Sequence, residues 1–180
     1  MAVDPELVEE VGQLVMEDFS KEQAEKVGKW ACQSEDHAGA LIQLVIESDV
    51  PVAKRAAWSL GGLGEHKAEV LNPHMALMHK GLQNPSHDAV ARAIFRSLSM
   101  MDIPEDWRGE FLDQAFGYMQ NPQNNPAVRV FAMQTAYNLS LPFPELLDEL
   151  LMVLEQHYDE GSAGFKNRAG KLMAKIRKSR

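Results

Sequence analysis

The sequence predicts an all-α protein, a solenoid of about five antiparallel helix pairs within a single domain over residues 1–180. Apolar residues recur at spacings of three and four along segments of roughly 11–17 residues, which is the helical period. Proline, asparagine, aspartate and glycine separate these segments at regular intervals. An arginine recurs near the start of alternate segments, at spacings of 37, 37 and 39 residues, within the range of helical-pair repeats.

The N-terminal part of the chain predicts two helix pairs, 4–33 and 36–64. Asp4 precedes Pro5, a capping side chain followed by proline at the first helical position. Ser20 and Gln23 stand at the spacing of a capping box. The expected helices are 4–18, 20–33, 36–48 and 51–64.

The rest of the chain predicts three more pairs, 71–101, 104–140 and 143–178. Each boundary coincides with an X-Pro step or a glycine-rich turn, where a helix ends or begins. The expected helices are 71–82, 86–101, 104–120, 126–140, 143–158 and 164–178. The linkers are short, so neighbouring helices should pack antiparallel.

Arginine opens the second helix of four pairs, in similar surroundings. The segments contain Val52-Ala53-Lys54-Arg55-Ala56-Ala57-Trp58, Val90-Ala91-Arg92-Ala93, Val128-Arg129-Val130-Phe131-Ala132 and Phe165-Lys166-Asn167-Arg168-Ala169. This pattern over residues 36–178 resembles the HEAT repeat, and residues 55–63 resemble the related armadillo helix. The resemblance implies a right-handed α-α superhelix. It also implies that the second helix of each pair lines a concave surface.

Charge separates between the two sets of predicted helices, although the whole chain carries a net charge of −8. The five inner helices hold 14 basic and three acidic residues, a net +11, whereas the outer helices sum to −14. Six of the 14 basic residues lie in the last helix, where cations favour the helix dipole. The pattern predicts a partly basic concave groove for an acidic protein or peptide partner.

The predicted partner-binding residues are the cations and one aromatic residue of the inner helices: Lys54, Arg55, Trp58, Arg92, Arg96, Arg129, Arg168 and Lys171. The recurrent arginines also have a structural interpretation, because arginines in such arrays commonly bond to the neighbouring turn. Aromatic residues at helical spacing, such as Trp58 and Phe95, are more often core than anchor.

No residue pattern predicts a catalytic centre, a cofactor or a metal site. His74 and His79 are five residues apart, not the four that place two ligands on one helix face. Cys32 lies in a helical pattern and is expected to be a buried, inert thiol. The glycines from Gly61 to Gly64 end a predicted helix and are expected to form its C-cap rather than a phosphate loop.

A non-catalytic binding scaffold is the leading functional hypothesis, because it requires no special residues. One alternative is a nucleic-acid-binding module similar to HEAT-like glycosylases that excise alkylated bases, with Asp88 and Trp58 as the comparable groups. Another is an accessory subunit of a small-molecule lyase or other enzyme, for which no constellation of residues is found. A single cysteine, no N-terminal signal pattern and no apolar run long enough for a bilayer predict a cytoplasmic protein.

Ala56 should lie between helix pairs if the predicted faces are right. We expect Ala56→Asp to lower the free energy of unfolding by about 3 kcal/mol or more, because it buries an unpaired charge. Urea unfolding followed by circular dichroism measures this change. Wild-type stability in the variant would show that the predicted face is wrong.

Overall fold

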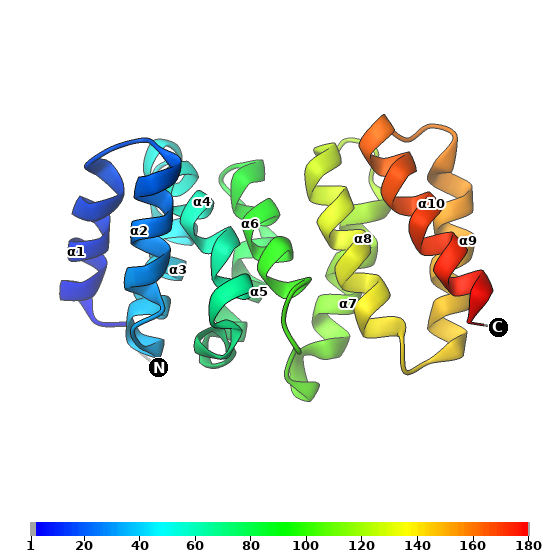
Figure 1. Ribbon diagram of the computed structural model, residues 1–180, viewed down its shortest axis with the longest axis horizontal. Helices are drawn as coiled ribbons and strands as arrows, with labels where there is room; N and C mark the ends of the chain where they lie inside the picture. Colours follow the sequence, from blue (N-terminus) through cyan, green and yellow to red (C-terminus); the bar gives the residue numbers. More distant parts are fainter. Residues whose placement is uncertain (1–2, 180) are drawn as a thin grey trace. The chain divides into compact units, whose positions relative to one another are not determined.

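The computed structural model of the chain describes residues 3–179 and is all-α over this range, with no strand. Met1, Ala2 and Arg180 lie outside the described residues. Met1 and Ala2 belong to the N-terminal segment in which the sequence shows no signal pattern, and Arg180 contributes to the net charge of the chain. The ten predicted helices are all present (Figure 1). They are α1 (Pro5–Met16), α2 (Lys21–Ala31), α3 (Glu35–Glu47), α4 (Val50–His66), α5 (Met75–Gln83), α6 (Asp88–Leu98), α7 (Arg108–Gln120), α8 (Pro126–Ser140), α9 (Pro144–Tyr158) and α10 (Ala163–Lys178), with two 3-10 helices, η1 (Ala68–His74) and η2 (Glu105–Trp107).

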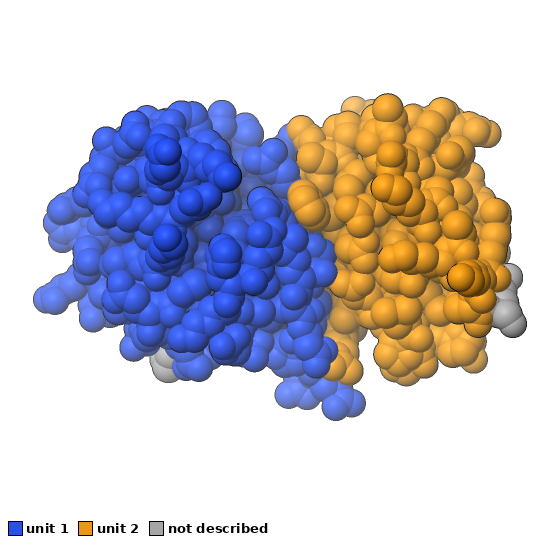
Figure 2. Space-filling view, in the orientation of Figure 1, with its two compact units in different colours: residues 1–107 blue, residues 108–180 orange. Residues whose placement is uncertain are grey.

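The chain divides into two compact units, coloured separately in Figure 2. Unit 1 runs from Met1 to Trp107 and contains α1 to α6. Unit 2 runs from Arg108 to Arg180 and contains α7 to α10. Each unit buries its own apolar side chains, and each is described separately below.

Unit 1 consists of two layers of helices. The helices α1, α3 and α5 pack in sequence in one layer, and α2, α4 and α6 lie side by side in the other (Figure 1). The core between the layers is built from fully buried side chains: Leu41, Ile42, Leu60, Leu63, Leu71, Met78, Ile94 and Phe95. Phe95 is therefore a core residue, and Ala56 is also completely buried.

Unit 2 is centred on α8, which packs against α7, α9 and α10. Its core combines aromatic and aliphatic side chains from all four helices: Phe111, Ala115, Met119, Ala132, Met133, Leu150, Leu154, Phe165 and Leu172. In α7 and α9 the listed residues are four apart, and in α10 the buried residues Phe165, Ala169, Leu172 and Ile176 are four, three and four apart, so the helical period in the sequence identifies them.

Side-chain caps confirm several predicted helix starts. Asp4 accepts a hydrogen bond from the Glu6 amide at 2.9 Å, and Pro5 follows as predicted. Ser20 accepts one from the Gln23 amide at 3.2 Å, but only this half of the capping box forms. The Gln23 side chain instead donates to the Leu14 carbonyl in the last turn of α1, which also accepts from the backbone amide of the C-cap residue Glu17 at 3.4 Å.

Two predicted helices differ at their N-terminal ends. The segment predicted at 71–82 begins with η1, and regular α-helix starts only at Met75. Pro73 explains this difference, because it has no amide hydrogen to donate within a regular α-helix. The segment predicted at 104–120 likewise begins with the short 3-10 helix η2, and α7 starts at Arg108.

The prediction that Gly61 to Gly64 form a helix C-cap is wrong. All of these residues lie inside α4, which continues to His66 and ends at Lys67. Gly61 and Gly64 instead allow α6 to pack closely against α4. A Cβ atom added at Gly64 would lie 2.9 Å from the Ser97 carbonyl oxygen, and one added at Gly61 would lie 3.3 Å from Arg96 Cδ.

His74 anchors η1 to α3 inside unit 1. The imidazole is buried, and its Nε2 lies 2.7 Å from the Glu35 carbonyl oxygen. A Cβ atom added at Gly39 would lie 2.5 Å from His74 Cε1, so the ring fits only against a glycine. His74 therefore has a structural position in the packing of α3.

Gly62 and Gly64 test the close approach of α4 and α6. We expect Gly64→Val to lower the free energy of unfolding by about 2 kcal/mol or more, because backbone atoms of α6 occupy the required space. Gly62→Ala is the control, since no atom lies within 4 Å of its added Cβ and alanine is the better helix former. Urea unfolding of both variants measures the difference. Equal stabilities would contradict the packing of α4 on α6.

Candidate functional site

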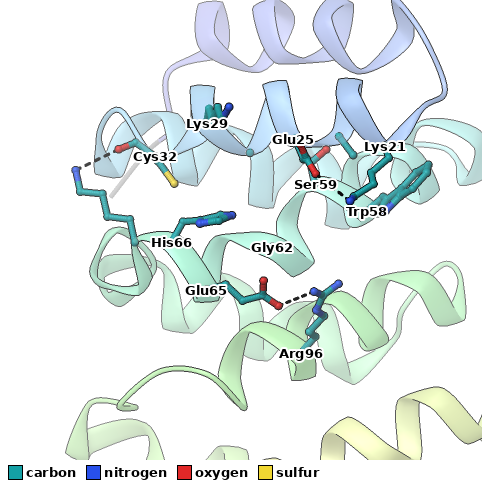
Figure 3. Close-up of a pocket in the computed structure, with 13 residues that line it drawn as sticks. Lys21, Glu25, Lys29, Cys32, Trp58, Ser59, Gly62, Glu65, His66 and Arg96 are labelled. Atoms are coloured by element: carbon teal, nitrogen blue, oxygen red, sulfur yellow. Dashed lines mark hydrogen bonds and ion pairs between the residues drawn. The ribbon is translucent and has the colours of Figure 1, made fainter.

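A groove of about 760 Å³ lies on unit 1 between α2 and α4, and Arg96 of α6 borders it (Figure 3). Its floor is made of small residues: Ala24 and Gly28 from α2, and Ser59 and Gly62 from α4. No atom lies within 4 Å of a Cβ added at Gly62, so this part of the floor is open. A floor without long side chains lets another chain approach the helix backbones closely.

Charged side chains on both sides of the groove are largely paired with one another. Lys21 and Glu25 lie 3.5 Å apart on α2, and Arg96 Nη2 lies 2.6 Å from Glu65 Oε1. Lys29 has no ion-pair partner among residues 3–179. The Lys21–Glu25 and Arg96–Glu65 pairs are exposed and contribute little to stability. Their side chains are therefore available to exchange partners.

An aromatic cluster forms one end of the groove. The Trp58 side chain is 40% exposed and meets Phe19, which is 59% exposed, edge to face with ring centres 5.4 Å apart. Arg55 lies over the other ring, with its Cζ 5.1 Å from the centre of Phe19. Hydrogen bonds involving the Ser20 side chain and the Phe19 backbone lower the pKa of nearby Asp18, so its carboxylate stays charged beside Arg55.

The exposure of Trp58 shows that it is not a buried core residue. Core placement was the commoner expectation for an aromatic residue at helical spacing, but the indole stands at the edge of the α2–α4 contact and not between the layers. Exposed tryptophan next to arginine is typical of the residues that dominate binding energy at protein interfaces.

Cys32 and His66 lie at the opposite end of the groove (Figure 3), and Lys67 also lines it. Lys67 Nζ donates to the Cys32 carbonyl oxygen at 3.2 Å. Burial raises the pKa of the half-buried Cys32 thiol, and the Lys67 charge only partly opposes this. A thiol with a raised pKa is a poor nucleophile at neutral pH.

Arg129 does not line a groove, in contrast to its prediction as a partner-binding residue. It is 6% exposed, its Nε donates to the Met119 carbonyl oxygen at 2.8 Å, and its Cζ lies 4.2 Å from the centre of the Phe165 ring. Burial lowers the pKa of this guanidinium. The side chain therefore joins α7, α8 and α10 within unit 2.

The other predicted cations lie on the surfaces of the two units. Lys54 and Arg92 are exposed in unit 1, and Arg92 makes no hydrogen bond or ion pair among the described residues. Arg168 and Lys171 belong to α10 in unit 2, where Arg168 Nη1 donates to Gln134 Oε1 at 2.7 Å.

The basic excess of the even-numbered helices is concentrated in unit 2. Seven basic and four acidic residues lie in α2, α4 and α6. Seven basic residues and no acidic residue lie in α8 and α10. The separation of charge predicted along the whole chain therefore has two different local forms: the basic residues are partly balanced by acidic ones within α2, α4 and α6, and they are unopposed within α8 and α10.

Comparison with known proteins identifies the family. The HEAT repeat domain matches residues 12–176, which is nearly the whole chain. The chain belongs to the HEAT repeat family. HEAT repeat domains are typically protein-interaction scaffolds and are usually non-catalytic. A search of the curated proteins finds no match to this HEAT repeat chain.

Over residues 3–179, no three or more His, Cys, Asp and Glu side chains come together in a group suited to a metal ion. No described helix combines the length and the apolar character required to cross a membrane.

Sequence reasoning missed Lys21, Lys29 and the small residues of the groove floor. Ala24, Gly28 and Gly62 do stand at helical spacing on two inner helices, and that spacing is the signal that identifies a close helix contact. It does not distinguish a packed contact, as at Gly64, from an open one, as at Gly62. That difference depends on the neighbouring helix.

Arg129 should behave as a structural residue of this HEAT repeat chain. We expect Arg129→Leu to lower the free energy of unfolding by about 2–3 kcal/mol, because it leaves the Met119 carbonyl without its donor and removes the contact with Phe165. Arg92→Leu, at an exposed position, should change it by no more than about 0.5 kcal/mol. Urea unfolding compares the two. If Arg92→Leu lost stability and Arg129→Leu did not, the structural role assigned to Arg129 would be wrong.

Proposed function

We propose that this protein is a non-catalytic interaction module whose groove between α2 and α4 binds a short segment of an acidic protein partner. The observation that carries the proposal is the combination of a floor of small residues with an exposed Trp58 at its end. A volume of about 760 Å³ is within the range of sites that enclose small ligands. It suits a few residues of a peptide.

Apolar contacts supply the first part of the proposed recognition. An apolar or aromatic side chain of the partner would pack on Trp58 and over Gly62, displacing water from both surfaces. Phe19 meets the Trp58 ring edge to face, and Arg55 in turn lies over Phe19, so the indole is ordered before binding and loses little freedom. This preorganisation favours a rigid anchoring role for Trp58.

Charge supplies the second part of the proposed recognition. Lys21, Lys29, Lys67 and Arg96 border the groove, against the two carboxylates Glu25 and Glu65. An acidic side chain on the partner would therefore meet an excess of cations. Such pairs contribute mainly to the rate and specificity of association.

Gly62 provides a way to fill the groove without disturbing the fold. We expect Gly62→Phe to weaken peptide binding at least about tenfold and to leave thermal stability intact, because the added side chain enters open space on a helix. Randomised peptides displayed on phage would be selected on the full chain. The dissociation constants of enriched peptides would then be measured by fluorescence anisotropy.

Gly117→Phe is the matched control, since Gly117 in α7 is also open to solvent and belongs to unit 2. Trp58→Ala should weaken the same peptides by a similar factor. The proposal predicts enrichment of acidic residues next to an apolar or aromatic residue. Enriched peptides that bind Gly62→Phe as well as they bind the wild type would refute a role for this groove.

A further inference from the structure

One face of α10 carries a row of four cations. Arg168, Lys171, Lys175 and Lys178 follow one another at spacings of three, four and three residues, which brings them to the same side of the helix. Two of them contact α8: Arg168 donates to Gln134, and Lys175 Nζ lies 5.8 Å from the centre of the Tyr137 ring. The row therefore runs along the junction of α10 with α8.

A hollow of about 630 Å³ lies at the beginning of this row. The α8 side of the hollow is mainly apolar and includes Val130 and Phe131, and the α10 side presents Asn167, Arg168 and Lys171. Gly164 also lines it, and no atom lies within 4 Å of a Cβ added there. The surface thus has an apolar side and a cationic side.

The cations of this surface lack nearby negative partners. Neither α8 nor α10 contains an acidic residue. Arg177 pairs with Glu155 of α9 at 2.6 Å, whereas Lys171 and Lys175 have no ion pair among residues 3–179. Like charges held close together repel, so a ligand that brings carboxylates to this row would lower its electrostatic energy.

We propose that this α8–α10 surface is a second binding site, which takes an acidic amphipathic helix of a protein partner. The row extends from Arg168 to Lys178, a rise of about 15 Å along the helix, and its spacing equals that of carboxylates along one face of another helix. Apolar residues on the adjacent face of that helix would pack on Val130 and Phe131, as in helix-in-groove recognition. The site is independent of the groove between α2 and α4 and has different chemistry.

A long polyanion fits this surface less well. The neighbouring helix α9 carries Glu145, Asp148, Glu149 and Glu155 and no lysine or arginine, and the chain as a whole has a net charge of −8. A nucleic acid that extended beyond the row would meet this repulsion. It would also leave the apolar side of the hollow without a partner. A short acidic helix avoids both costs, since charges separated by more than about 8 Å are largely screened at physiological salt.

A designed peptide tests the proposal on the full chain. It would be a fluorescent helical peptide of about 14 residues, with glutamates at alternating spacings of three and four and leucines on the adjacent face. A second peptide of identical composition would distribute its glutamates around the helix. We expect the patterned peptide to bind at least about tenfold tighter in anisotropy titrations, because only it aligns its carboxylates with the row.

Variants then locate the binding. The double variant Lys171→Glu/Lys175→Glu and the single variant Gly164→Phe should each weaken the patterned peptide at least about tenfold. Lys54→Glu/Arg92→Glu makes the same change in net charge at two exposed positions of unit 1 outside both sites, and should change affinity less than about twofold. Gly62→Phe should have no effect, so failure of this site and failure of the α2–α4 groove are distinguishable. Circular dichroism establishes that each variant is folded.

Three results would overturn the proposal. Equal affinities for the two peptides would show that the row does not recognise helical spacing. A labelled single-stranded oligonucleotide that binds more tightly than the peptide and loses affinity in Lys171→Glu/Lys175→Glu would assign the surface to nucleic acid. Self-association of the wild-type chain in analytical ultracentrifugation that disappears in this double variant would assign it to a second copy.

Discussion

The close approach of α4 and α6 is the constraint on which the architecture of unit 1 depends. Gly64 allows the Ser97 carbonyl to lie against the α4 backbone, and the Ser97 hydroxyl donates to the Leu60 carbonyl at 3.0 Å in the same contact. Gly61 lets the aliphatic part of Arg96 cross α4, which brings its guanidinium to Glu65. A packing requirement between two helices thus sets one border of the groove, so stability and the shape of the candidate site share the same residues.

The repeat supplies equivalent positions, but the repeat arginines have different surroundings. Arg55 lies over an exposed phenylalanine, Arg92 is exposed, Arg129 is buried among three helices, and Arg168 bonds to an amide on α8. The side chain is long and carries several donors, so it can satisfy a backbone carbonyl, an amide or an aromatic face from the same helical position. The repeat therefore predicts the helical position of each arginine. The surroundings of the side chain decide whether that arginine stabilises the fold or remains available to a partner.

The two candidate surfaces differ in how their charges are balanced. Two of the four cations around the α2–α4 groove, Lys21 and Arg96, pair with carboxylates within unit 1, and the distinctive features there are Trp58 and the small floor residues. Cations along α10 mostly lack such partners, and the apolar residues beside them belong to α8. An interaction module with two surfaces of this kind would bind two segments of different chemistry, and linked segments would bind more tightly together than either alone.

Helical period, capping residues and the arginine spacing in the sequence determined the all-α class, the number of helices and most helix bounds. These features are local, because a helix forms its backbone hydrogen bonds within one segment. Tertiary structure alone decided that Gly61 and Gly64 continue α4, that Arg129 is buried while Trp58 is exposed, and that Gly62 opens into a groove. Each of these outcomes depends on which atoms of a neighbouring helix lie within a few ångströms, and residue spacing along one helix contains no information about those atoms.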